Sequence, residues 1–329
     1  LYLKLDETSG TAAADASPAA QVAQVLPRLA DALLGSVPSP GGLARHHFTL
    51  AEPTRLYIDS LAHDSSLRWA LAGPLGTVAS GRSFQSTDSL DGSAIYDLAA
   101  GSYTLTVSAT GDSTAEFALR LLDLGLATAI DRGQSVSGSL VPARATAAYS
   151  FSATAGERIF IDTTVNSGGD TWWRLLDPFG QVLSGPASIA NDLDVTALPF
   201  TGRYTLLLEG RAYNAAARND HAFTVQTVVD GTQAMVPGDR VDGSLAHAGQ
   251  RQTYTFSLAS AGAWVFDALT NDSQIGWTLT GPAGTLVADR RFGSSDSAHI
   301  GGSTLLSLLA GDYTLVIDGA GSHVGSFAF

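Results

Sequence analysis

The residues of this chain best suited to chemistry are aspartates that recur at matching places in two stretches of the sequence. Loops rich in Asp, Asn and Ser provide the oxygen ligands that calcium prefers, so the pattern predicts calcium sites. The alternative is that the same carboxylates bond backbone N–H groups in turns, since no EF-hand spacing is present. The candidate calcium ligands are Asp59, Asp64, Asp88, Asp267, Asp272 and Asp296.

A third stretch lies between these two and repeats the pattern less faithfully. It has Asp162 and Asp192 at the corresponding places, but Ser167 replaces the aspartate found at Asp64, with Asp170 nearby. Because calcium needs several oxygen ligands at once, we expect this middle copy to bind the ion poorly.

Two adjacent tryptophans suggest a second kind of site. One of Trp172 and Trp173 is expected to fill a core, and an extra residue before them predicts a bulge that re-aims the other. An outward tryptophan together with Tyr213 could stack on a sugar ring, as aromatic faces do. The alternative is that it is only the exposed edge of a core aromatic. Trp172, Trp173 and Tyr213 are therefore the candidate carbohydrate-binding residues.

Two adjacent histidines do not predict a metal site. His46 stands where the other copies have Tyr149 and Tyr254, so we expect it to face a core. His47 must then face the other side of the strand, because neighbouring strand residues point in opposite directions. The two rings therefore cannot readily chelate one ion together.

No enzyme signature is present. The chain has no cysteine, no GxSxG elbow and no HExxH helix, which removes the commonest nucleophile and zinc arrangements. The glycine-rich "DGAGSHVG" at 318–325 lies between two expected strands, whereas a phosphate-binding loop opens a helix. We therefore expect a protein that is not an enzyme.

The candidate sites belong to a unit that occurs three times. Its landmarks recur in order: a phenylalanine, an aspartate, a tryptophan, a Pro-containing turn and a strand of the form Gly-x-Tyr-Thr-Leu. The units are about 100 residues apart, the size of a small β-sandwich. Alternating apolar residues such as Tyr103, Leu105 and Val107 predict strands, and the Gly-Pro pairs predict tight turns.

These patterns predict an all-β chain of three tandem antiparallel, jelly-roll-like β-sandwiches. We assign residues 32–126 to repeat 1, 127–231 to repeat 2 and 232–329 to repeat 3, the last shortened at its C-terminal end. Residues 1–31 are expected to form a strand remnant and a linker that contains a short amphipathic helix. The helix is predicted because Val22, Val25, Leu26, Leu29 and Leu33 have a helical spacing after Ser17-Pro18.

The repeats resemble the bacterial pre-peptidase C-terminal type of β-sandwich over roughly residues 32–329. The resemblance rests on "VSGSLVPARATAAYSFSATAGERIFID" (136–162), "VDGSLAHAGQRQTYTFSLASAGAWVFD" (241–267), "TNDSQIGWTLTGPAGTL" (270–286) and "LAGDYTLVIDG" (309–319). It implies a non-catalytic accessory module with a jelly-roll-like fold, of a kind in which some members bind calcium or polymeric substrates and others space domains apart. Residues 1–17, "LYLKLDETSGTAAADAS", resemble the start of a laminin-G or concanavalin-like domain, and equally the last strand of a preceding repeat.

Charge and composition restrict the partners. The 329 residues carry a formal charge of −13, which repels nucleic acid and anionic lipid, and no apolar run reaches the length of a membrane helix. We expect a secreted or bacterial cell-surface module that spaces, extends or anchors neighbouring domains of a longer chain, as an adhesin does, with calcium as its expected cofactor. The alternative is an accessory module that binds a polysaccharide or protein polymer.

Overall fold

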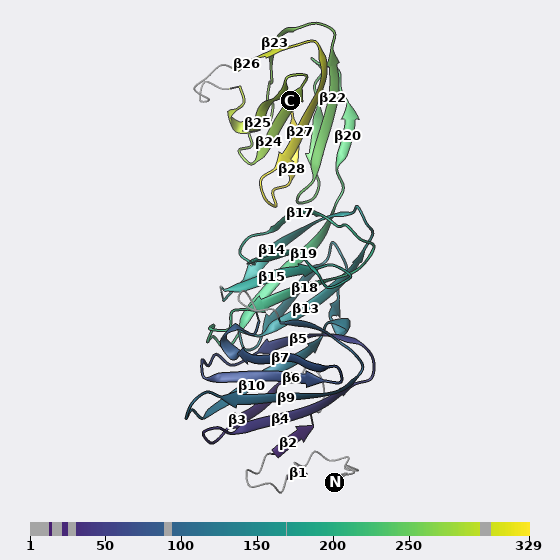
Figure 1. Ribbon diagram of the computed structural model, residues 1–329. Coiled ribbons are helices and arrows are strands. Elements are labelled where there is room, and N and C mark those ends of the chain that lie inside the picture. The colour runs from purple at the N-terminus through teal and green to yellow at the C-terminus, as the bar shows by residue number, and fades with distance from the viewer. Residues whose placement is uncertain (1–12, 15–21, 26–30, 89–93, 169, 297–303) are drawn as a thin grey trace.

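The protein is all-β in a computed structural model that describes residues 13–14, 22–25, 31–88, 94–168, 170–296 and 304–329. Within these ranges the regular structure consists of strands and short 3-10 segments, without an α-helix. No helix among the described residues is long and apolar enough to cross a membrane. The three repeats follow one another along the long axis of the molecule (Figure 1).

Repeat 1 is built from two sheets, and two strands from the residues before it extend the larger one. The larger has the order β1 (Ala13–Ala14), β2 (Val22–Val25), β4 (Leu43–Leu50), β9 (Gly101–Ala109), β6 (Leu67–Gly73) and β7 (Gly76–Ser83). The smaller has the order β3 (Leu33–Val37), β10 (Ala115–Asp123), β5 (Thr54–Ser60) and β8 (Ile95–Leu98). Strands from both sheets contribute to a single apolar core, as in a sandwich.

Repeat 2 has the same two sheets. One has the order β11 (Thr128–Ala129), β13 (Thr146–Ala153), β18 (Gly202–Gly210), β15 (Thr171–Leu176) and β16 (Val182–Ser188). The other has the order β12 (Ser135–Leu140), β19 (Asn219–Val228), β14 (Arg158–Asn166) and β17 (Leu193–Ala197).

Repeat 3 keeps the first sheet but divides the second. The intact sheet has the order β20 (Gly231–Ala234), β22 (Arg251–Leu258), β27 (Gly311–Gly319), β24 (Ile275–Gly281) and β25 (Gly284–Arg291). The other sheet is present as two separate pairs, β21 (Asp242–Leu245) with β28 (Gly325–Ala328), and β23 (Gly262–Val265) with β26 (Leu305–Leu308).

Each repeat has its own apolar core, and the recurring aromatic residues lie in it. The recurring phenylalanine and tyrosine stack with nearly parallel rings in every repeat: Phe48 on Tyr103 at 5.2 Å, Phe151 on Tyr204 at 5.8 Å and Phe256 on Tyr313 at 5.2 Å between centroids. Each tyrosine hydroxyl donates to the carbonyl four residues earlier, on Ala99, Phe200 and Leu309. The recurring aromatic residues thus have the same packing role in all three repeats. Independent folding of each repeat stays a prediction.

The predicted linker helix is wrong for the part that the structure describes. Val22–Val25 is a strand, β2, which pairs in parallel with β4, and Leu33 begins β3. The same parallel pairing recurs between β11 and β13 and between β20 and β22. The register also corresponds, because Gln24 lies opposite His46, Thr128 opposite Tyr149 and Gln233 opposite Tyr254. Residues Val22–Val25 therefore form an edge strand beside β4 of repeat 1, in place of the helix that their spacing predicted. Leu26 and Leu29 lie outside the described residues.

Candidate functional site

In every repeat, the aspartate that follows the tryptophan hairpin accepts a hydrogen bond from the backbone N–H of the residue after Asp59, Asp162 or Asp267. Asp88 accepts a hydrogen bond from the Ser60 N–H at 2.5 Å, and Asp192 accepts one from Thr163 at 3.0 Å. Asp296 does the same for Ala268 at 2.7 Å. The recurrence of this aspartate is thus explained by backbone hydrogen bonding.

Asp64 and Asp272 form turns of their own. Asp64 Oδ1 accepts from the Ser66 N–H at 2.7 Å, and Asp272 Oδ1 accepts from the Gln274 N–H at 2.7 Å. Asp272 Oδ2 also lies 2.9 Å from His323 Nε2. These contacts match the turn alternative considered for the sequence.

The structure brings Asp59 beside Asp88, but it does not gather the six candidate ligands into ion sites. Among the described residues, no three acidic or histidine side chains form a group that could hold a metal ion. Asp59 is instead paired with Arg120, and Asp267 is exposed. Calcium binding therefore stays a prediction, least favoured at Asp59, where a guanidinium already supplies the positive charge.

Of the two adjacent tryptophans of repeat 2, Trp173 is the one that fills the core. Trp69, Trp173 and Trp277 are buried and face the corresponding residues of β9, β18 and β27. The extra residue is absorbed by a register shift in β14 between Thr163 and Val165. Trp69 and Trp277 donate their ring N–H to Thr87 and Ser295.

Trp172 and Tyr213 both contact Arg211, while Trp173 is buried in the core and does not join them. The Arg211 guanidinium lies 5.6 Å from the Trp172 ring centroid and 5.1 Å from that of Tyr213. Tyr213 also meets His63 of repeat 1 edge to face, at 6.4 Å. This cluster, Trp172–Arg211–Tyr213, therefore sits beside the junction of repeats 1 and 2.

An apolar cluster joins repeat 1 to repeat 2. Tyr57, Ala94 and Leu124 of repeat 1 pack with Leu176 and Leu207 of repeat 2, and all five are buried. Figure 1 shows the corresponding elements, β5 of repeat 1 and the β13–β18–β15 sheet of repeat 2, in direct contact. Burial of apolar side chains across two repeats makes their separation costly, at roughly 25 cal/mol for each Å² re-exposed.

A buried polar network surrounds this cluster. The Tyr57 hydroxyl donates to Glu209 Oε1 at 2.7 Å, and Arg174 Nε donates to Glu209 Oε2 at 3.2 Å. Both Tyr57 and Glu209 are almost completely buried, so their polar atoms depend on these hydrogen bonds. Tyr57 depends on Glu209 of repeat 2, and Glu209 depends on Tyr57 of repeat 1 and on Arg174 of its own repeat. Loss of one partner would leave a buried polar group unsatisfied, at a cost of about 1–3 kcal/mol.

Arg120 extends the same network between the repeats. Its guanidinium pairs with Asp59 of its own repeat and donates to the Thr146 carbonyl of repeat 2 at 2.8 Å. The Thr146 N–H in turn donates to Asp59 Oδ2 at 3.2 Å. At the rim, Arg55 pairs with Asp97 at 2.6 Å and donates to the Phe179 carbonyl. These bonds fix the orientation of the two repeats as well as their contact.

Burial dominates the protonation of the carboxyl groups in this junction. It raises the pKa of Asp88 well above its usual value, and the neighbouring Asp59 carboxylate raises it further. Burial also raises the pKa of Asp59 and of Glu209, against the opposing effects of Arg120 and Arg174. Asp59 and Asp88 each have one buried oxygen without a hydrogen-bond partner among the described groups, which is where a proton can reside.

The sequence analysis identified Asp59 and Asp88 but missed Tyr57, Arg120, Arg174 and Glu209. The sequence held two signals for these residues. Glu209 follows the apolar residues of "YTLLLEG", and Arg174 lies between Trp173 and Leu175. A charged residue within an apolar strand indicates a covered outer face.

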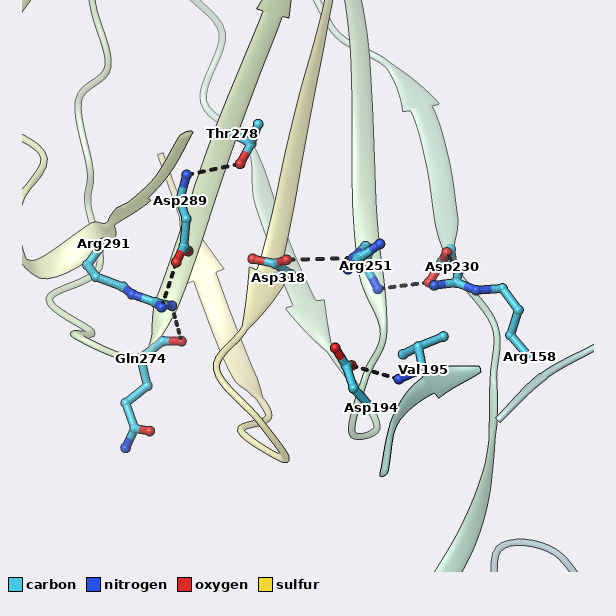
Figure 2. A network of polar contacts seen from close by, with 10 residues as sticks. All are labelled: Arg158, Asp194, Val195, Asp230, Arg251, Gln274, Thr278, Asp289, Arg291 and Asp318. Atoms are coloured by element: carbon cyan, nitrogen blue, oxygen red, sulfur yellow. Dashed lines mark hydrogen bonds and ion pairs between the residues drawn. The ribbon is translucent and has the colours of Figure 1, made fainter. Parts of the chain in front are cut away.

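The junction between repeats 2 and 3 contains a group of polar contacts. Asp230 bridges the repeats, since it pairs with Arg158 of repeat 2 and accepts from the Arg251 N–H of repeat 3 at 2.9 Å (Figure 2). Arg251 Nε lies 3.6 Å from Asp318. A cavity of about 430 Å³ lies alongside, lined by residues that include Phe160, Asp194 and Gly249.

Comparisons with known proteins identify no family: no family model and no curated protein matches the chain. Among solved structures, the periplasmic g-type lysozyme inhibitor PliG of Aeromonas hydrophila is 18% identical, with a TM-score of 0.25 over 31% of this chain and 95% of that one. The CUB1-EGF-CUB2 region of rat MASP-1 is 9% identical, with a TM-score of 0.23 over 62% and 99%. A triple jelly-roll protein of an archaeal virus is 12% identical, with a TM-score of 0.15 over 91% and 87%. These similarities are too weak to support an argument about function.

Proposed function

We propose that this chain is a non-catalytic module of a secreted or bacterial cell-surface protein, and that it holds neighbouring domains at a fixed spacing. The observation that supports this best is the junction of repeats 1 and 2. Its apolar cluster and buried Tyr57–Glu209 and Arg120–Thr146 bonds couple two sandwiches into one stiff unit. A spacer needs stiffness between its units, whereas a catalyst needs a site for substrate.

The charge of the chain fits this role. A net charge of −13 disfavours nucleic acid and anionic membranes as partners, and it keeps an extended protein soluble. The partners we propose are the neighbouring domains of a longer chain. The resemblance to pre-peptidase C-terminal sandwiches agrees with this proposal, and membership of that family is itself a proposal.

Energy transfer between fluorescent domains fused to the two ends of the chain tests the spacer role. We expect one transfer efficiency with a narrow spread, because the buried junction of repeats 1 and 2 holds these two repeats together. A Gly/Ser linker of the same length is the control, since such linkers behave as random coils. Transfer that follows the Gly/Ser control in magnitude and spread would refute the spacer role.

A second candidate function is supported by the Trp172–Arg211–Tyr213 cluster. Two aromatic rings and a cation beside a junction resemble the elements that bind sugar rings or polymers. Glycan-array binding that Tyr213→Ala abolishes and Phe179→Ala leaves intact would support polysaccharide binding. Phe179 is a suitable control because it is an exposed aromatic of the same repeat.

Calcium remains a proposed cofactor of repeats 1 and 3. Titration calorimetry of the full chain tests it, with Asp64→Asn and Asp272→Asn as variants and Asp170→Asn as the control. Heat that both variants remove and the control retains would support calcium binding. The absence of calcium-dependent heat in the unmodified chain would exclude it.

A further inference from the structure

The buried glutamate of the first junction has a counterpart at the second. Glu209 in β18 and Asp318 in β27 each lie five residues after the recurring tyrosine, and they pair with Thr146 and Arg251 on the neighbouring strands. Glu209 accepts the Tyr57 hydroxyl of the preceding repeat and is completely buried. Asp318 lies at the corresponding place and lines the cavity that repeat 3 shares with repeat 2.

Repeat 2 does not offer Asp318 the partner that repeat 1 offers Glu209. Phe160 takes the place of Tyr57, and a phenylalanine has no hydroxyl to donate. Phe160 and Asp318 both line the cavity of about 430 Å³. The Asp318 carboxylate pairs with Arg251 of its own repeat at the long distance of 3.6 Å (Figure 2). The second junction therefore keeps the acidic residue of the first without the bond that closes it.

Carboxylates from both repeats surround this cavity. Asp192 and Asp194 of repeat 2 line it together with Asp318 of repeat 3. Burial raises the pKa of Asp318 against the opposing effect of Arg251, and the carboxylates of Asp289 and Asp194 raise it further. Because Asp194 belongs to the other repeat, its repulsion of an ionised Asp318 favours separation of the two repeats.

The same junction is also held by attractive contacts. Asp230 pairs with Arg158 of repeat 2 and accepts from the Arg251 N–H of repeat 3. Gly249 packs closely on repeat 2, since a Cβ at this position would lie 2.8 Å from the Val195 side chain. A tied contact beside a cavity with facing like charges is the arrangement that a hinge requires.

We propose that the junction of repeats 2 and 3 is a hinge that closes when Asp318 is neutral and opens when Asp318 is ionised. The closed hinge keeps Asp318 near Asp194 and away from water, so it binds the Asp318 proton more tightly than the open hinge does. The ratio of closed to open hinges therefore falls as the pH rises from the ordinary aspartate pKa of about 3.9 through the raised pKa of Asp318, by at most about tenfold per pH unit. The charged groups around Asp318 are Arg251, Asp289, Arg291, Asp192 and Asp194, with Asp230 and Arg158 at the tie. This hinge goes beyond the spacer role and does not depend on it.

The distance between spin labels at Ala155→Cys and Ala283→Cys in the full chain tests the hinge, in a titration from about pH 7.5 to about pH 4. We expect the distance distribution to shift on acidification. Asp318→Asn, which stays neutral, should show the acid distribution at every pH. Asp194→Asn, which removes the facing like charge, should shift the distribution at neutral pH in the same direction.

Two control variants separate Asp318 from other titrating groups. Asp312→Asn changes an aspartate at the far end of β27, and His247→Gln removes a histidine from the loop that precedes Gly249. Both should keep the shift of the unmodified chain. A distribution that does not change with pH would overturn the proposal, as would a shift that survives Asp318→Asn or disappears in His247→Gln. Labels at Leu75→Cys and Ala155→Cys report the first junction separately, so failure of the hinge is distinguishable from failure of the spacer role.

Discussion

Asp59 and Asp88 lie side by side where water is excluded, and this environment sets their protonation. Burial favours the neutral acid over the carboxylate, and a proton held on one of the two acids allows a hydrogen bond between them. Asp192 and Asp296 make the same backbone bond in more exposed positions. One residue type thus serves one structural role in three settings, and only in repeat 1 is the aspartate buried.

Asp88→Asn should flatten the pH dependence of stability above pH 4. Because the pKa of Asp88 is raised on folding, the native chain binds its proton more tightly than the unfolded chain does. The stabilisation is complete below the unfolded pKa and is lost as the pH rises through the folded pKa, by at most about 1.4 kcal/mol per pH unit. Asparagine can still accept from Ser60. Urea unfolding from pH 4 to 8 measures the effect, with Asp296→Asn as the exposed control; identical slopes for Asp88→Asn and the unmodified chain would contradict it.

His46 gives repeat 1 the opposite sensitivity. Burial, with a smaller contribution from His47, lowers the pKa of His46 to about 4, and the ring packs edge to face on Phe117 at 5.7 Å. Protonation therefore favours the unfolded chain, and stability is lost as the pH falls from the ordinary histidine pKa of about 6.5 toward 4. We expect acidification to lower the Tm of the unmodified chain by several degrees. His46→Tyr, which copies Tyr254 of repeat 3, should remove this acid-induced loss. Equal acid sensitivity of variant and unmodified chain would disprove this.

At the scale of strands, close approach explains the glycine that recurs in β3, β12 and β21. A Cβ on Gly243 would lie 2.5 Å from the Phe327 ring, and one on Gly35 would lie 2.4 Å from Phe117. Gly138 is similarly crowded by His221 and Tyr149. The glycine therefore leaves room for an aromatic ring of the partner strand.

Gly243→Ala should destabilise the chain by about 1–3 kcal/mol, because the ring or the strand must move. Gly325→Ala in the paired strand is the matched control, since its Cβ would meet nothing closer than 3.7 Å. Thermal unfolding of both variants provides the comparison. Equal Tm values would show that crowding at Gly243 does not limit stability.

Alternation and turn residues predicted the strands from sequence, because each strand of these sandwiches has one face in a core. The same reasoning placed His46 in the core and His47 outside, and the structure confirms both. It failed for Val22–Val25, where parallel edge pairing with β4 outweighs a helical spacing. It also left open which of Trp172 and Trp173 fills the core, because spacing alone does not locate a bulge.

At the scale of the whole molecule, the two junctions differ in chemistry. The first is apolar and hydrogen-bonded within a dry interior, while the second depends on Asp230 and its arginines near the surface. The sequence could not predict this difference, since both junctions use corresponding residues of similar repeats. Tyr57, Phe160 and Val265 occupy one place in the three repeats, yet their surroundings differ.

Asp230→Asn should loosen the second junction, because it removes the charge that pairs with Arg158 near the surface. It should leave the first junction unchanged, because that junction is buried and does not contain Asp230. Spin labels at Ala155→Cys and Ala283→Cys report the second junction, and the chain has no other cysteine. We expect a broader distance distribution in the variant. Asp242→Asn, which removes an exposed pair with Arg240, is the control. An unchanged distribution would mean that Asp230 does not hold repeat 3.

The rigidity of the junction between repeats 1 and 2 is tested most directly by the distance between spin labels at Leu75→Cys and Ala155→Cys, both exposed. One narrow distance distribution, the same at low salt and at roughly 0.5 M salt, is the result expected of a buried junction. A broad distribution, or one that shifts with salt, would show that the two repeats move independently and would contradict the spacer function.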